Sequence, residues 1–141
     1  MSNTTKTVLL SGVGGQGAIL AADILSRVAM ASGQDVKLSE IHGMAQRGGA
    51  VTTVVRLGDS VASMVADKGS VDYLVSFETI EALRNIEYLK VDGELLVNDE
   101  SIKPLPVATG AVAAPTGVHE SLEAAGALLV PAEALAKQAG S

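Results

Sequence analysis

Short apolar runs alternate with segments of helical periodicity along most of the chain. Runs of this length and character are typical of buried strands, and the segments between them show the helical spacing of apolar residues. The expected strands are residues 6–11, 35–38, 50–57, 73–77, 94–98 and 127–130. The expected helices are residues 16–31, 79–89, 119–125 and 132–139. This alternation predicts an α/β fold, a three-layer α/β/α arrangement around a mixed, mostly parallel, Rossmann-like sheet.

Turn and capping residues refine this outline. Gly58-Asp59 predicts a turn after which residues 60–65 return as a hairpin strand, and that hairpin would make the sheet mixed. Thr79 is the expected N-cap of the helix that follows it. Residues 99–118 hold three of the four prolines and are expected to be irregular.

The expected helix at 16–31 is unusually apolar. Its polar residues Gln16, Asp23 and Arg27 lie on one narrow stripe, and Asp23 and Arg27 form an i,i+4 pair. A helix this apolar is buried on more than one side. We therefore expect it to pack on the sheet and also against a second surface.

Length and charge limit the classes of function. The 141 residues are expected to form a single domain over 1–141. The net charge is −6 and the ten Lys and Arg are scattered, so we expect no nucleic-acid partner. Only Tyr73, Phe77 and Tyr88 are aromatic, which leaves little for stacking bases. The sequence shows neither a signal-peptide pattern nor an apolar run of about 18 residues, which predicts a cytoplasmic protein without a membrane partner.

The chain contains no cysteine. Disulfides, thiolate nucleophiles and cysteine-ligated iron–sulfur clusters are thereby excluded for these residues. If the protein takes part in redox chemistry, the electrons leave through another chain. The mean hydropathy of +0.35 is high for a small acidic protein, which indicates apolar surface covered by a partner, although the alanine content explains part of it.

A glycine loop, Gly12-Val13-Gly14-Gly15-Gln16-Gly17, follows the first expected strand and opens the first helix. In this context the G-x-G-x-x-G pattern predicts an anion site. Gly12 would permit the tight turn, Gly14 would let a phosphate approach the backbone, and Gly17 would let the helix pack close to the strand. The helix N-terminus would offer free N–H groups to the anion.

Two other interpretations of this loop stay open. In the first it is a dinucleotide site, with Glu40 as the ribose-binding acid 23 residues after Gly17. The second strand is short and runs at once into another loop, which counts against this interpretation. In the second the glycines only let the helix sit tightly on the sheet.

A second loop follows the second expected strand. Residues 39–51 read Ser-Glu-Ile-His-Gly-Met-Ala-Gln-Arg-Gly-Gly-Ala-Val, so that polar side chains stand between glycines at a strand end. This composition is typical of a binding loop. Arg47 is a candidate for binding a carboxylate or phosphate, His42 for a polar contact or proton donor, and Gln46 for a hydrogen-bond partner of either. The alternative is that Arg47 forms an interface ion pair and His42 only holds the loop.

Together the two loops resemble the gamma-type domain of 2-oxoacid:ferredoxin oxidoreductases. The stretch His-Gly-Met-Ala-Gln-Arg-Gly-Gly at 42–49 is most similar to the beta subunit of the indolepyruvate members. The resemblance covers residues 6–100 well and 104–118 loosely. Family sequences continue past this point with further helical sequence, so truncation at Ser141 is one interpretation.

The resemblance implies a role in a larger enzyme. Such enzymes decarboxylate a 2-oxoacid on thiamine diphosphate, pass electrons through iron–sulfur clusters to ferredoxin and form an acyl-CoA. It implies that thiamine diphosphate, Mg and the 4Fe-4S clusters belong to a larger partner subunit, that coenzyme A is a co-substrate, and that this chain alone binds no cofactor. His42 and Arg47 would then support catalysis. The expected cofactor-facing residues are Gly12, Gly14, Gly15, Gln16, Gly17, Gln46, Gly48 and Gly49.

Two further classes of function remain as alternatives. One is a stand-alone Rossmann-like nucleotide-binding or regulatory module. The other is a purely structural subunit of the same complex. The sequence does not separate them, because the two loops would be present in each case.

Overall fold

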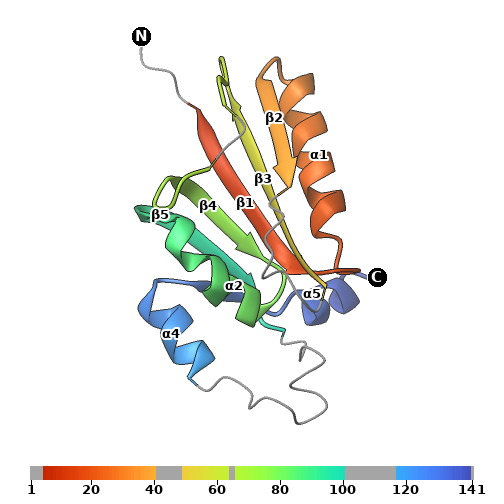
Figure 1. Ribbon diagram of the computed structural model, residues 1–141. Coiled ribbons are helices and arrows are strands. Elements are labelled where there is room, and N and C mark those ends of the chain that lie inside the picture. Colours follow the sequence, from red (N-terminus) through yellow and green to blue (C-terminus); the bar gives the residue numbers. More distant parts are fainter. Residues whose placement is uncertain (1–4, 41–48, 64–65, 101–116, 141) are drawn as a thin grey trace.

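The computed structural model describes residues 5–40, 49–63, 66–100 and 117–140 (Figure 1). Its strands are β1 (Lys6–Val13), β2 (Asp35–Glu40), β3 (Ala50–Gly58), β4 (Val71–Ser76), β5 (Leu89–Asn98) and β6 (Leu128–Val130). Its helices are α1 (Ala18–Ala31), α2 (Thr79–Asn85), α4 (Val118–Ala124) and α5 (Ala132–Gln138), with a 3-10 turn η1 (Ile86–Tyr88). The strands form one six-stranded sheet in the order β2-β3-β1-β4-β5-β6.

Helices cover both faces of the sheet, as a three-layer α/β fold requires. One core cluster packs the sheet against α2 and α4 and includes Leu9, Leu74, Ala82 and Leu122. A second packs the opposite face against α1, around Val8, Leu10, Ala22 and Val55. Neighbouring residues of one strand point to opposite faces, so β1 supplies Leu9 to the first cluster and Leu10 to the second. The predicted fold class is confirmed.

The sheet is mixed because of β3 alone. This strand runs antiparallel to both of its neighbours, β2 and β1, whereas β1, β4, β5 and β6 pair in parallel. The predicted hairpin strand at 60–65 is wrong for residues 60–63, which form no strand, and residues 64–65 lie outside the described residues. Both edges of β3 are already paired, so a returning strand would have no edge to join.

Side chains hold this segment in place of ladder hydrogen bonds. The Val61 N–H donates to Asp35 Oδ2 at 2.8 Å, and Arg56 Nη1 donates to the Ser63 carbonyl at 2.7 Å. Val61 is buried in consequence, at 4% exposure.

Helix α1 begins at Ala18, two residues later than predicted, and lies on β1, β2 and β3. It has 14 residues, whereas about 20 are needed to cross a bilayer. None of the helices in the described ranges is long and apolar enough to span a membrane.

Helix α2 is capped by Glu78 instead of the predicted Thr79. The Glu78 backbone is extended, with φ −152° and ψ 142°, and its Oε1 accepts the Glu81 N–H at 2.7 Å. Thr79 already has helical backbone and therefore belongs to the first turn. Glu78 is 1% exposed, so this hydrogen bond forms away from water.

We predict that Glu78→Ala lowers the free energy of unfolding by about 1–2 kcal/mol, because the buried Glu81 N–H loses its acceptor. Urea unfolding followed by circular dichroism measures this change. Glu87→Ala is the control, since Glu87 is exposed and pairs with Lys68 at 3.4 Å on the surface, and its cost should stay below about 0.5 kcal/mol. Equal effects of the two substitutions would contradict the capping role.

Candidate functional site

The two glycine loops meet at one edge of the sheet. The Gly14 N–H donates to the Gly49 carbonyl at 2.7 Å, directly beyond the register pair Val13–Ala50 that joins β1 to β3. Gly49 has φ +84°, a conformation that favours glycine. Both loops therefore open on the same edge of the sheet, as far as the described residues extend.

His42, Gln46, Arg47 and Gly48 lie outside the described residues. The loop that carries them leaves β2 after Glu40 and rejoins the described chain at Gly49, beside Gly14. Their predicted roles therefore remain predictions.

The glycines of the first loop are needed for two different reasons. A Cβ on Gly12 would lie 2.9 Å from Gln16 Oε1 and 3.1 Å from Phe77 Cβ, so the turn is as tight as predicted. Gly15 and Gly17 each have φ +90°, and a Cβ on either would meet nothing within 4 Å. The packing role predicted for Gly17 is therefore wrong, because what requires glycine there is the left-handed backbone.

Gln16 braces the loop against the end of β4. Its Oε1 accepts the Val13 N–H at 2.7 Å, and its Nε2 donates to the Phe77 carbonyl at 3.2 Å. Asn98 Nδ2 donates to the same carbonyl, also at 3.2 Å. Gln16 and Asn98 thus tie the ends of β1, β4 and β5 together. The predicted contact between Gln16 and a ligand is untested, but both ends of its amide already have partners.

A hollow of about 280 Å³, which we call the glycine hollow, opens between the two loops and the start of α1. It is lined by Val13, Gly14, Gly15, Gly17, Ala18, Ile19 and Val51. Its side chains are apolar, so polar contacts come from backbone groups. Gly17, the N-cap of α1, supplies no side-chain hydrogen bond, and the first turn has no acidic residue. Among the described residues, no side chain caps the first N–H groups of the helix, so they can donate to an anion.

The order of the strands counts against a dinucleotide site. In that interpretation Glu40 would bind a ribose held beside the glycine loop. Glu40 ends β2, and β3 lies between β2 and β1, so about 9–10 Å of sheet separates the two strands. A ribose-binding acid would be expected on a strand next to β1.

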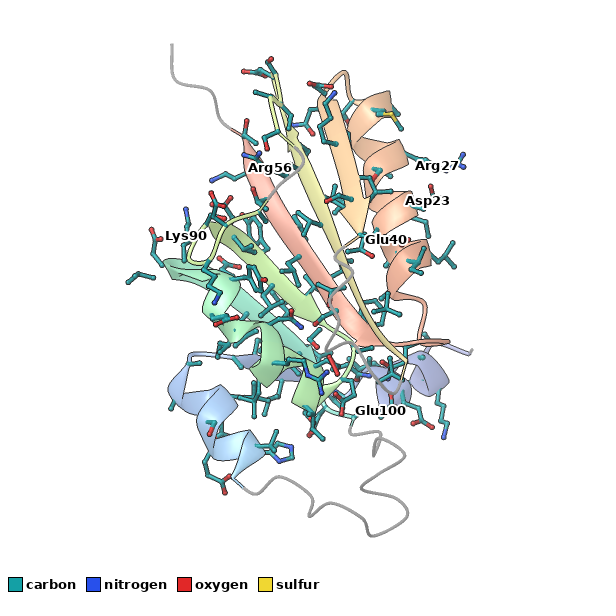
Figure 2. The ribbon with its side chains drawn as sticks, viewed as in Figure 1. Asp23, Arg27, Glu40, Arg56, Lys90 and Glu100 are labelled. Carbon is teal, nitrogen blue, oxygen red and sulfur yellow. The ribbon has the colours of Figure 1, made fainter. Side chains whose placement is uncertain are left out.

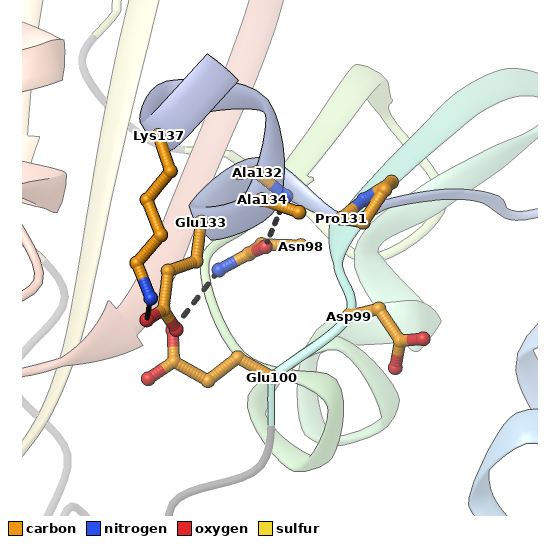
Figure 3. Close-up of a pocket in the computed structure, with 8 residues that line it drawn as sticks. All are labelled: Asn98, Asp99, Glu100, Pro131, Ala132, Glu133, Ala134 and Lys137. Carbon is orange, nitrogen blue, oxygen red and sulfur yellow. Dashed lines mark hydrogen bonds and ion pairs between the residues drawn. The ribbon is translucent and has the colours of Figure 1, made fainter. Parts of the chain in front are cut away.

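A second hollow, of about 310 Å³, lies beyond the ends of β5 and β6 (Figure 3). Asn98 organises it: its Oδ1 accepts the Ala132 N–H at 3.1 Å and its Nδ2 donates to Glu100 Oε2 at 3.1 Å. Glu133 pairs with Lys137 at 3.0 Å along α5, which forms one wall of the same hollow. Asp99 and Glu100 add negative charge, so this hollow is the less suitable of the two for an anion. Within the described ranges, His, Asp and Glu side chains form no group that could hold a metal ion.

Sequence reasoning missed Asn98. The signal was present, because Asn98 ends an apolar strand and immediately precedes two acids. Polar residues at that position lie at the carboxyl edge of a parallel sheet, where sites of α/β proteins gather.

Buried polar groups connect this edge to α2. Ser11 Oγ donates to Ser76 Oγ at 3.0 Å, and Ser76 Oγ donates to the Glu78 carbonyl at 2.7 Å. Glu81 is also buried, and its Oε2 has no hydrogen-bond partner among the described residues. Burial raises the pKa of Glu81, an effect that Arg84, 3.6 Å from Oε1, only partly offsets.

His119, to which the sequence analysis gave no role, pairs with Asp99. His119 Nε2 lies 2.7 Å from Asp99 Oδ1, and this hydrogen bond raises the pKa of the imidazole above its ordinary value. Both side chains are exposed, at 55% and 44%. The pair joins α4 to the end of β5.

With this geometry in view, the class of protein follows from comparison with known families. Residues 7–141 match the family model described as pyruvate ferredoxin/flavodoxin oxidoreductase. The chain belongs to this family. The resemblance seen in the two loops is confirmed.

Among individual relatives, the indolepyruvate oxidoreductase subunit IorB of Thermococcus kodakarensis is 41% identical over 109 residues, 77% of this chain and 54% of that protein. IorB of Methanothermobacter thermautotrophicus is 40% identical over 97 residues, 69% of this chain and 49% of that protein. A more distant relative, the pyruvate synthase subunit PorC of Methanocaldococcus jannaschii, is 30% identical over 89 residues, 62% of this chain and 50% of its own length. This chain therefore spans about half the length of the relatives it matches.

Solved structures of oxoacid ferredoxin oxidoreductases have a similar fold. The gamma subunit of a keto/oxoacid ferredoxin oxidoreductase from Geobacter sulfurreducens superposes with a TM-score of 0.55 at 31% identity, over 66% of this chain and 50% of that one. A 2-oxoglutarate:ferredoxin oxidoreductase from Magnetococcus marinus matches all of this chain and 22% of its own, with a TM-score of 0.67 at 16% identity. The second match shows the fold alone.

We predict that Gln16→Ala lowers the free energy of unfolding by about 1–2 kcal/mol, because the Val13 N–H loses its partner inside the loop. Denaturant unfolding measures the change. Gln138→Ala, on the exposed face of α5, is the control and should have little effect. A neutral Gln16→Ala variant would show that the brace does not stabilise the loop.

We predict that Asp99→Asn returns the pKa of His119 toward its ordinary value of about 6.5. A raised folded-state pKa means that the pair stabilises the fold below the unfolded-state pKa and that this contribution is lost as the pH rises through the folded-state pKa. Titration of the His119 ring protons by NMR, in the wild type and the variant, measures both values. If the pKa of His119 is the same in the variant as in the wild type, Asp99 is not the cause of the raised value.

Proposed function

We propose that this chain is the non-cluster subunit of a thiamine-diphosphate-dependent 2-oxoacid:ferredoxin oxidoreductase. The favoured substrates are aryl pyruvates such as indolepyruvate, because the relatives named above include indolepyruvate oxidoreductase subunits. The reaction takes two electrons from the 2-oxoacid, releases carbon dioxide and joins the acyl group to coenzyme A. The electrons pass through the partner subunit to ferredoxin.

The observation that supports this proposal most directly is the hydrogen bond between Gly14 and Gly49. It joins the two loops that carry the resemblance into one site beside the start of α1. Family membership supports the class of enzyme, and this contact supports the location of the chain's own contribution.

The division of labour follows from residue chemistry. The chain has no cysteine, so clusters with thiolate ligands are assigned to the larger subunit. Thiamine diphosphate, when bound there with Mg, supplies the carbanion stabilisation that decarboxylation needs. This chain contributes backbone donors at the glycine hollow and the polar side chains of the loop that ends at Gly49.

The start of α1 and the polar residues of the second loop then each have a defined part. The N–H groups at the start of α1 bind an anionic group, a carboxylate of the 2-oxoacid or a phosphate of coenzyme A. Arg47 supplies a planar, bidentate partner for the same group, and Gln46 orients it. His42 holds or delivers a proton beside the substrate.

A reconstituted complex with the larger subunit tests this function. We predict that Arg47→Ala lowers kcat/KM for the 2-oxoacid, or for coenzyme A, by roughly 10- to 100-fold, the effect of losing a charge-assisted hydrogen bond. The measurement is 2-oxoacid-dependent reduction of ferredoxin or a dye. Lys68→Ala, which removes an exposed cation near the start of β4, is the control and should leave kcat/KM unchanged.

Three outcomes separate the classes of function. Loss of kcat/KM in Arg47→Ala alone supports a site role. Unchanged kcat and KM in the Arg47→Ala variant would indicate that the chain is a purely structural subunit. Micromolar binding of a nucleotide by the isolated chain, without any effect of the larger subunit, would favour the stand-alone module.

A further inference from the structure

Among the described residues, one half of the sheet has no helix packed on it on the side where α1 lies. Helix α1 packs on β1, β2 and β3, whereas the same face of β4, β5 and β6 carries apolar side chains that stay accessible. We call this surface the uncovered half. Its apolar side chains are Tyr73, Val75, Phe77, Leu96, Leu128 and Val130, and the exposed carboxylate of Glu94, opposite Tyr73 in the register, lies on the same face.

Along β4 and β5, side chains on the α2 face are buried, whereas those on the opposite face are partly exposed. Leu74 and Leu95 face α2 and are 0% and 3% exposed. On the opposite face Val75 and Leu96 are only half-buried, and Leu128, next in the same row, is 61% exposed. A parallel sheet normally has both faces covered.

The uncovered half is also hollowed. A cavity of about 250 Å³ opens over Val75, Phe77, Leu96 and Val130, and its walls are almost entirely apolar. Such a cavity fits apolar side chains from a helix that lies across it.

Helix α1 presents a matching surface. Leu20, Ile24 and Val28 recur at i, i+4 and i+8 on its outer side and are 61%, 52% and 59% exposed. Arg27 lies beside Leu20 on the same outer side, and Asp23 flanks it; the two side chains pair with each other at 2.9 Å (Figure 2). Apart from that pair, the outer side of the helix is as apolar as a buried one.

We propose that a second copy of this chain covers both surfaces. In the dimer, α1 of each copy lies with Leu20, Ile24 and Val28 on the uncovered half of the other. A two-fold axis roughly parallel to the strands achieves this, because it sets the two α1 helices side by side in one layer between two sheets. The contact is isologous, since each copy supplies one helix face and one sheet face.

The area favours this arrangement over simpler ones. A helix of 14 residues is about 21 Å long and about 10 Å wide, so each apolar surface offers roughly 200 Å². Four such surfaces meet in the dimer, so roughly 800 Å² is buried, which is close to the lower limit of about 1,000 Å² for a specific interface. Stacking α1 on α1 alone would bury about half as much. A single helix from another protein would cover the sheet but leave Leu20, Ile24 and Val28 in water.

Sedimentation equilibrium of the full chain tests the proposal. The wild type should dimerise with a dissociation constant in the micromolar range. Ile24→Glu and Leu96→Lys should each raise that constant by roughly 30-fold or more, the effect of losing a central interface residue. Val91→Glu is the matched control, because Val91 is fully exposed on another part of β5. Circular dichroism and urea unfolding check that each variant folds.

Mixing the two variants gives the decisive result. In a heterodimer of Ile24→Glu with Leu96→Lys, the introduced carboxylate meets the introduced ammonium at one of the two helix–sheet contacts, and the other contact is wholly wild type. Dimers should therefore reappear in the mixture although neither variant dimerises alone. A mixture that stays monomeric, or a wild type that is monomeric at about 100 µM, would overturn the proposal.

Engineered cysteines give an answer even if a charged variant fails to fold. The chain has no cysteine of its own, so any cross-link reports only the introduced pair. Ile24→Cys mixed with Leu96→Cys should form a disulfide-linked heterodimer on mild oxidation. Cross-linking of Ile24→Cys to itself in preference to Leu96→Cys would show helix stacking instead and would overturn the arrangement.

Discussion

The antiparallel strand β3 determines the geometry of the candidate site. It lies between β2 and β1, and its first residue pairs with the last residue of β1. This register brings Gly49 to Gly14 and so joins two loops that are distant in the chain. If β2 were paired directly with β1, as in a dinucleotide-binding fold, the second loop would start beside the first instead of ending beside it.

Two hydrogen bonds to the Phe77 carbonyl hold together the strand ends at this edge of the sheet. Phe77 O accepts from both Gln16 and Asn98, so side chains from the glycine loop and from β5 hold the chain where it leaves β4. Ser11 and Ser76 are buried beneath this point and hydrogen-bonded to each other. Buried polar groups of this kind stabilise one arrangement only when their partners are all in place. These hydrogen bonds therefore hold the ends of β1, β4 and β5 together beside the glycine hollow, although none of these residues lines it.

The sequence predicted the α/β class, most strands and the tight turn at Gly12, because these depend on local periodicity and on the glycine pattern. It did not predict the position of β3, since strand order is set by pairing between segments distant in sequence. The hairpin at 60–65 failed for this reason: the local turn signal at Gly58-Asp59 was present, but both edges of β3 were taken. The cap at Glu78 was missed because its carboxylate is less common in that position than the Thr79 hydroxyl. The roles of His42 and Arg47 depend on what approaches the loop, which no local pattern determines.

The exposure of the glycine hollow to water favours a subunit over a stand-alone binding module. Its donors are N–H groups, and water competes for them as long as the hollow is exposed. Covering the start of α1 would bury Ile19, which lines the hollow and is 51% exposed, and would lower the local dielectric around those donors. Hydrogen bonds to an anion strengthen in such an environment. If the hollow binds an anion, as proposed above, its backbone donors would hold that anion weakly in the isolated chain and more strongly once another polypeptide closes the hollow, as expected of a subunit.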